Sequence, residues 1–106
     1  MAAQEKKYKV IFSTKATQML VAHAAFLAQV SEQAAERLVM LVEAAARSLE
    51  TMPHRCPWFV GDLLPTHTYR KLIVEGRYLM IYQVQADTVF IDFVVDGKQD
   101  YEWLIR

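Results

Sequence analysis

The stretch YRKLIVEGRYLMIYQV, residues 69–84, decides the fold of this chain. It contains two apolar runs rich in β-branched and aromatic residues, on either side of the turn-forming pair Glu75-Gly76. This pattern predicts two antiparallel strands joined by a tight turn, over roughly Tyr69–Val74 and Arg77–Gln85. The stretch also carries three basic residues, Arg70, Lys71 and Arg77. It is therefore either a hairpin that completes a core, or a basic surface that acts on RNA, a nucleotide enzyme or a partner protein.

The residues that follow continue the sheet. VFIDFVV predicts a third strand of this meander over Thr88–Val95, joined to the second by the short connection Ala86-Asp87. Asp96-Gly97 turns the chain again, and Tyr101–Ile105 fits either a last strand or a helical turn.

The residues before the hairpin predict a strand and two helices. YKVIF, residues 8–12, has strand character, and Ser13-Thr14 can cap a helix behind it. Ser31 caps a second helix, and we expect Pro53 to end it because proline lacks the N–H that a helix needs. The residues expected on one face of the first helix are Ala16, Met19, Leu20, His23, Phe26, Leu27 and Val30. Those expected on one face of the second are Ala35, Leu38, Val39, Val42, Ala45, Ala46 and Leu49.

The order β-α-α-β-β-β predicts an α+β fold, in which a helix hairpin packs on a mainly antiparallel sheet. Residues 54–68 form a loop that Trp58 and Phe59 pin to the core. With 106 residues the chain suits one domain, residues 1–106.

The amino-acid composition favours some classes of function and argues against others. Hydrophobic residues make up 54% of the chain, which is above the usual range and predicts an apolar surface for a protein partner. The formal charge is zero, which argues against a generally basic nucleic-acid coat protein. The single Cys56, with no leader or membrane span in the sequence, predicts a cytoplasmic protein that does not contact a membrane. Cys56 and His54 lack a second ligand pair, so we expect no metal and no cofactor.

Four motifs in this order resemble the RelE/ParE superfamily of bacterial toxins. The first is YKVIFSTKA, which precedes the helix hairpin, and the second is Arg70-Lys71-Leu72, at the start of the strand predicted over Tyr69–Val74. The third is YLMIYQV, in the strand predicted over Arg77–Gln85, and the last is VFIDFVVDGKQDY, at the end of the chain. The resemblance covers nearly the whole chain. It implies the toxin of a type II toxin–antitoxin, or plasmid stabilisation, module, held in a hetero-oligomeric complex by a cognate antitoxin.

The resemblance also implies one of two targets. RelE-type members cut messenger RNA in the ribosome, whereas ParE-type members poison DNA gyrase. Ribosome-dependent members place an arginine directly after the first tyrosine of the strand that corresponds to Arg77–Gln85 here, but in this chain Leu79 follows Tyr78. Arg77 lies one residue earlier, which in a strand points to the opposite face. This difference favours a ParE-like inhibitor that is not an enzyme.

A nuclease with a variant site, or an inactive remnant that only binds the antitoxin, are the alternatives. RNA cleavage would need a base, an acid and a cation for the developing charge. The candidate catalytic residues on that reading are Arg70, Arg77, Lys98 and Tyr101, with His67 as a further candidate base. Each also has a structural interpretation: a solvated strand face for Arg70, a solvated turn for Arg77, a packed C-terminus for Tyr101, and a loop position for His67.

We expect the antitoxin to cover the sheet face away from the helices, or the adjacent helix groove. The candidate partner-binding residues are Arg70, Lys71, Tyr82, Asp92 and Trp103.

Overall fold

The computed structural model describes residues 6–61 and 64–97 of the chain. In chain order its elements are β1 (Lys9–Phe12), α1 (Thr14–Ala28), α2 (Glu32–Ser48), the 3₁₀ turn η1 (Pro53–Arg55), β2 (Arg70–Val74), β3 (Tyr78–Gln85) and β4 (Thr88–Asp96). This order confirms the predicted β-α-α-β-β-β fold. The prediction for residues 101–105 lies outside the described residues.

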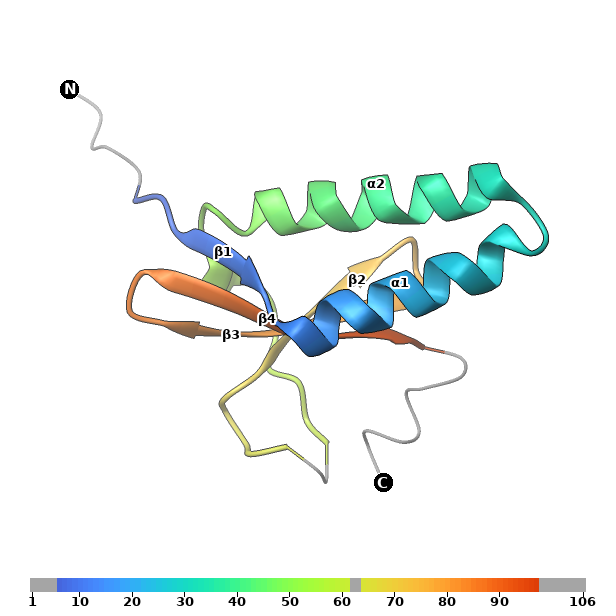
Figure 1. Cartoon of the computed structure of the whole chain (residues 1–106). Helices are drawn as coiled ribbons and strands as arrows, with labels where there is room; N and C mark the ends of the chain where they lie inside the picture. Colours follow the sequence, from blue (N-terminus) through green and yellow to red (C-terminus); the bar gives the residue numbers. More distant parts are fainter. Residues whose placement is uncertain (1–5, 62–63, 98–106) are drawn as a thin grey trace.

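The strands form one sheet in the order β1-β4-β3-β2, and both helices lie on the same face of it (Figure 1). The pairs β2/β3 and β3/β4 are antiparallel. By contrast, β1 runs parallel to β4, with Lys9 opposite Thr88 and Phe12 opposite Ile91. The first and last described strands are therefore neighbours, and β4 is a central strand.

The two alternating sets of apolar strand residues explain why the hairpin is apolar on both faces. One set packs against α1 and α2, with Tyr82, Met80 and Ile91 fully buried. The other set, Leu79, Ile81 and Val95, packs against Phe59 from the loop before β2. Phe59 is only 1% exposed, which confirms that it pins this loop to the core. The helices thus cover one face of the sheet and the loop covers part of the other, where Ile73 stays 55% exposed.

A β-bulge interrupts the pairing of β3 with β4. Tyr82 is opposite Ile91 and Ile81 is opposite Phe93, so Asp92 is an extra residue in β4. A bulge re-aims the side chains beside it. Here the Asp92 carboxylate accepts hydrogen bonds from the Tyr69 hydroxyl at 3.1 Å and the Gln83 amide at 2.8 Å.

Both predicted helix caps are present. The Ser13 hydroxyl accepts from the Ala16 N–H at 2.9 Å, and the Ser31 hydroxyl accepts from the Ala34 N–H at 3.1 Å. In α2 the predicted apolar face is confirmed, since Leu38, Val42 and Ala46 are buried.

Two details of the helices correct the sequence predictions. First, α2 ends at Ser48 rather than at Pro53, which instead opens η1 after Met52 in a left-handed conformation (φ 49°). Second, Phe26 and Val30 do not share the buried face of α1, because their exposed fractions are 56% and 88%. The end of the hairpin that joins α1 to α2 projects beyond the described strands (Figure 1), so these side chains have no sheet beneath them.

Candidate functional site

Arg77, the residue directly before β3, forms an ion pair with Asp96. Its guanidinium donates to both carboxylate oxygens of Asp96, at 3.2 and 2.8 Å, and the hydrogen bond raises the pKa of Arg77. The Asp96 side chain is 4% exposed and that of Arg77 is 36% exposed. A bidentate pair of this kind fixes both side chains. Arg77 therefore fastens the start of β3 to the end of β4.

Gly97 completes this contact through the main chain. Its N–H donates to the Arg77 carbonyl oxygen at 2.7 Å. A Cβ atom on Gly97 would lie 2.6 Å from that same oxygen, which is closer than van der Waals contact allows. The chain thus leaves β4 at a position where no side chain fits.

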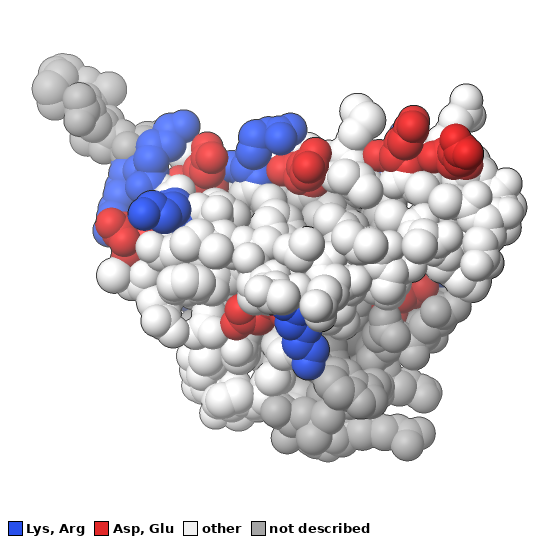
Figure 2. Space-filling model, viewed as in Figure 1, with Lys and Arg blue, Asp and Glu red and all other residues white. Residues whose placement is uncertain are grey.

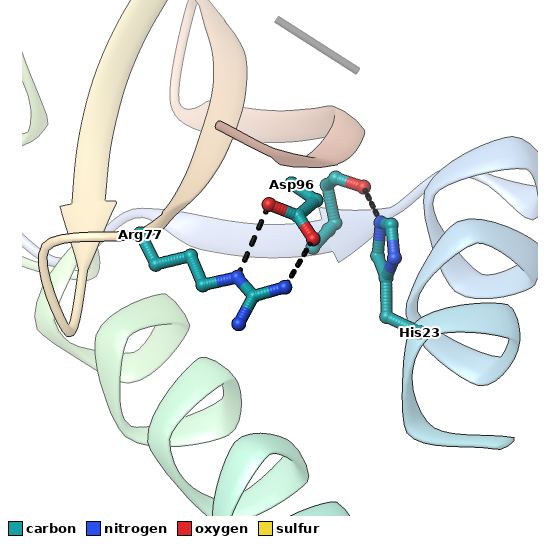
Figure 3. A network of polar contacts seen from close by, with 4 residues as sticks. His23, Arg77 and Asp96 are labelled. Atoms are coloured by element: carbon teal, nitrogen blue, oxygen red, sulfur yellow. Dashed lines mark hydrogen bonds and ion pairs between the residues drawn. The ribbon is translucent and has the colours of Figure 1, made fainter. Parts of the chain in front are cut away.

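His23 reaches the same end of the sheet from α1 (Figure 3). Its Nε2 lies 2.9 Å from the Val94 carbonyl oxygen and its ring is 5.5 Å from that of Tyr78. Since the partner is a carbonyl, Nε2 carries the proton and donates. Burial raises the pKa of Tyr78, the neutral ring on which His23 packs. His23 joins α1 to the sheet in this structure.

Arg70 lies at the other end of the hairpin, in a pocket of about 260 Å³. Its guanidinium stacks on the Trp58 ring at 3.8 Å, and Nη1 donates to the Cys56 carbonyl oxygen at 2.6 Å. His67 packs edge-on against Trp58, with the two ring centroids 5.5 Å apart. The residues that line the pocket are His54, Trp58, His67, Thr68, Arg70, Gln83, Val84 and Gln85. Arg70 is therefore part of an aromatic, cationic pocket.

The structure does not bring Arg70 and Arg77 together. Arg70 is opposite Tyr82, whereas Arg77 directly precedes Tyr78, which is opposite Val74. Arg77 is five residue steps from Tyr82, so at about 3.3 Å per residue the two arginines are separated by roughly 16 Å. One phosphate group cannot contact both. Lys98 and Tyr101, the other candidate catalytic residues, lie outside the described residues, as does the candidate partner residue Trp103.

The remaining candidate residues are in different environments. Lys71 is half-buried on β2 and Asp92 is held by Tyr69 and Gln83. Tyr82 is fully buried, and its hydroxyl donates to the Pro53 carbonyl oxygen at 2.6 Å. This placement corrects the expectation that Tyr82 lies on a partner-binding surface, because its strand face is the one that the helices cover.

Sequence reasoning missed two residues that organise these regions. Asp96 was interpreted only as part of a turn, although a carboxylate directly after Val94-Val95 is a possible partner for an arginine at the start of a neighbouring strand. Trp58 was expected to pin its loop, but its ring is 38% exposed and supports Arg70. Only the pairing register, with Trp58 bridged to Arg70, reveals that contact.

A second hollow lies between the helix hairpin and the β2–β3 turn. It has a volume of about 210 Å³, and Arg37 on α2 closes one side by a bidentate ion pair with Glu75 at 2.9 Å. Glu75 and Gly76 both have positive φ, 57° and 67°, which fits the tight turn predicted there. The apolar lining comes from both helices and includes Leu27, Leu38 and Leu41.

The outer surface of the helix hairpin is apolar. Exposed large side chains on it are Val21, Phe26 and Met40, with exposed fractions of 61%, 56% and 67%. Beside them a groove of about 420 Å³ is lined by Ala24, Ala35, Glu36, Val39 and Met40. Figure 2 shows this surface largely free of charged side chains, with acidic and basic ones along the edge over α2. This is the apolar surface that the composition predicts.

The described residues thus form an α+β domain in which a helix hairpin packs on one face of a four-stranded sheet. The model of the family "ParE toxin of type II toxin-antitoxin system, parDE" matches residues 10–101. The chain therefore belongs to the ParE toxin family, as the sequence resemblance implied.

A solved structure shares the fold. It is described as the chromosomal ParDE TA system from P. aeruginosa, and a chain of it superposes with a TM-score of 0.67 at 14% sequence identity. The match covers 86% of this chain and 97% of that one. A comparison with curated proteins finds no match.

Within residues 6–61 and 64–97, no helix is long and apolar enough to cross a membrane. Over the same ranges, His, Cys, Asp and Glu side chains do not gather in any group of three or more that could hold a metal ion.

Proposed function

We propose that this toxin inhibits DNA gyrase by binding it, and that a cognate antitoxin keeps it inactive by covering the apolar surface of the helix hairpin. ParE-type members of the superfamily poison gyrase, and this chain belongs to the ParE toxin family.

The observation that carries the choice of target is the environment of Leu79. Ribosome-dependent members of the superfamily have an arginine at the corresponding strand position. In this chain Leu79 is 7% exposed and packs with Phe59, Ile81 and Val95. A cation there would have to be buried among apolar side chains, which costs several kcal/mol without a partner. Arg77, the nearest arginine in sequence, already pairs with Asp96.

The hairpin surface supports the antitoxin part of the proposal. Phe59 and its loop cover part of the sheet face away from the helices, and the groove over α1 and α2 is an apolar surface open to a partner. An amphipathic helix in such a groove is a common mode of recognition. Because Glu36 lines this groove and is exposed, a basic side chain on the partner would complement it.

The test is controlled expression of the chain without antitoxin, followed by three measurements: growth, integrity of messenger RNA and plasmid supercoiling. We expect growth arrest with intact messages and altered supercoiling, and the purified chain should inhibit supercoiling by purified gyrase. Cut messages with normal supercoiling would establish the nuclease alternative instead. Normal growth with folded protein present would leave a remnant that only binds its antitoxin.

A further inference from the structure

We propose that the pocket around Arg70 and Trp58 binds a carboxylate-bearing segment of extended peptide, which pairs with the free edge of β3. The pocket is separate from the surface proposed for the antitoxin, since it shares no lining residue with the helix hairpin groove.

The edge of β3 is open at this pocket. The β2–β3 ladder ends at the pair Arg70–Tyr82, whereas β3 continues to Gln85. The Tyr69 carbonyl accepts from the Phe59 N–H and the Lys71 N–H donates to the Pro57 carbonyl, so these main-chain groups point away from β3. Main-chain direction alternates along a strand. The main-chain N–H and C=O groups of Arg70 therefore point toward β3, where Arg70 is opposite Tyr82. Those of Val84, two residues beyond Tyr82, point to the same side of β3, past the end of β2, where no strand pairs with them.

The pocket beside this edge carries positive charge. Its lining contains Arg70, two histidines and two glutamines, but no aspartate or glutamate. Stacking on Trp58 holds the guanidinium plane. The guanidinium has five N–H donors, and among the described contacts one nitrogen, Nη1, donates to the protein. A carboxylate is the group that the remaining donors fit best.

Size and charge favour a peptide over the other anionic ligands. The volume of about 260 Å³ is below the range of small-molecule and cofactor sites, roughly 300–1,000 Å³, but admits one or two side chains. Nucleic acid would require several cations along its phosphates, whereas this lining has one permanent cation. A strand edge, in contrast, offers alternating donors and acceptors that match a peptide main chain.

The experiment selects displayed random hexapeptides on the full-length chain, and again on the Arg70→Gln variant. We expect the wild-type selection alone to enrich peptides with Asp or Glu at one fixed position. The best peptide, made synthetically, should bind Arg70→Gln at least tenfold more weakly and Arg70→Lys to an intermediate degree. It should also shift the NMR signals of the Arg70 Nε–H and the Trp58 indole N–H.

Two controls isolate the features that the proposal uses. Arg37→Gln removes one exposed cation at the opposite end of the β2–β3 hairpin, beside Glu75, and should leave affinity unchanged. N-methylation of the peptide at the residue opposite Val84 should weaken binding tenfold without altering the protein. Thermal unfolding of each variant verifies that it is folded.

Several results would overturn the proposal. They are a selection without acidic enrichment, equal affinity for Arg70→Gln, or insensitivity to N-methylation. A 5′-phosphorylated single-stranded tetranucleotide that shifts the same two signals at lower concentration would show that the pocket binds nucleic acid instead. None of these outcomes depends on gyrase inhibition, so the two proposals fail separately.

Discussion

Two arginine–carboxylate pairs flank the β2–β3 turn, and they differ in burial. Arg37–Glu75 is exposed on both sides, whereas Arg77–Asp96 hides its carboxylate almost completely. Exposed pairs contribute little because water and salt screen them. A buried carboxylate that loses its partner is costly. The same kind of ion pair therefore contributes differently to the stability of the fold at the two positions.

We expect Arg77→Met to lower the free energy of unfolding by about 1–3 kcal/mol, below the full range for a buried pair since the Arg77 side chain stays 36% exposed. Arg37→Met is the matched control and should cause no measurable change. Urea unfolding at neutral pH measures both. Equal losses in the two variants would contradict the role given to burial.

Tyr82 predicts a dependence on alkaline pH. Burial raises the pKa of its hydroxyl well above the usual value of about 10. The phenol therefore stays protonated in the folded chain while the unfolded chain ionises. Its contribution to stability is complete below pH 10 and is lost as pH rises above that value.

Above pH 10 the free energy of unfolding should fall by up to about 1.4 kcal/mol per pH unit for this group. In Tyr82→Phe the fall should be shallower, though not absent, because burial also raises the pKa values of Tyr69 and Tyr78. The variant should be less stable at pH 8, by about 1–3 kcal/mol, since it leaves the Pro53 carbonyl without its donor. Parallel pH profiles for the two proteins would refute this explanation.

The loop before β2 covers part of the sheet face that lies away from the helices. Phe59 is its main anchor, packed on Leu79, Ile81 and Val95. Phe59→Ala should cost about 3–5 kcal/mol, as for other buried aromatic residues. Val60→Ala, next to it and 73% exposed, should cost almost nothing. Thermal unfolding compares them, and a small loss in Phe59→Ala would mean that the loop is not part of the core.

The elements were predictable wherever local chemistry decides them. Ser13 and Ser31 mark the helix starts because a hydroxyl there satisfies a free N–H, and Glu75-Gly76 marks the turn because both residues take positive φ. Long-range partners were not predictable. Nothing local indicates that β1 lies beside β4, that Asp96 holds Arg77, or that the bulge at Asp92 gathers Tyr69 and Gln83.

Over the whole molecule, the apolar surface of the helix hairpin should make the isolated chain self-associate. Phe26→Ser removes its largest exposed side chain and should shift the chain toward monomer, while co-purification with the cognate antitoxin should weaken. Val60→Ser, an exposed apolar residue on the loop, should change neither property. Analytical ultracentrifugation gives the first result and co-expression the second. Unchanged association in Phe26→Ser would show that another surface is responsible.

The parallel pairing of β1 with β4 means that the first strand of the sheet has no neighbouring strand until nearly the whole chain has been synthesised. The Ser13 hydroxyl, directly after β1, donates to the carbonyl of Asp92 across 79 residues of sequence. A nascent chain cannot place β1 until β4 has left the ribosome, and such distant contacts form slowly. Until then the helix hairpin lacks the sheet on which it packs. A chain cut off before β4 should therefore not reach this fold.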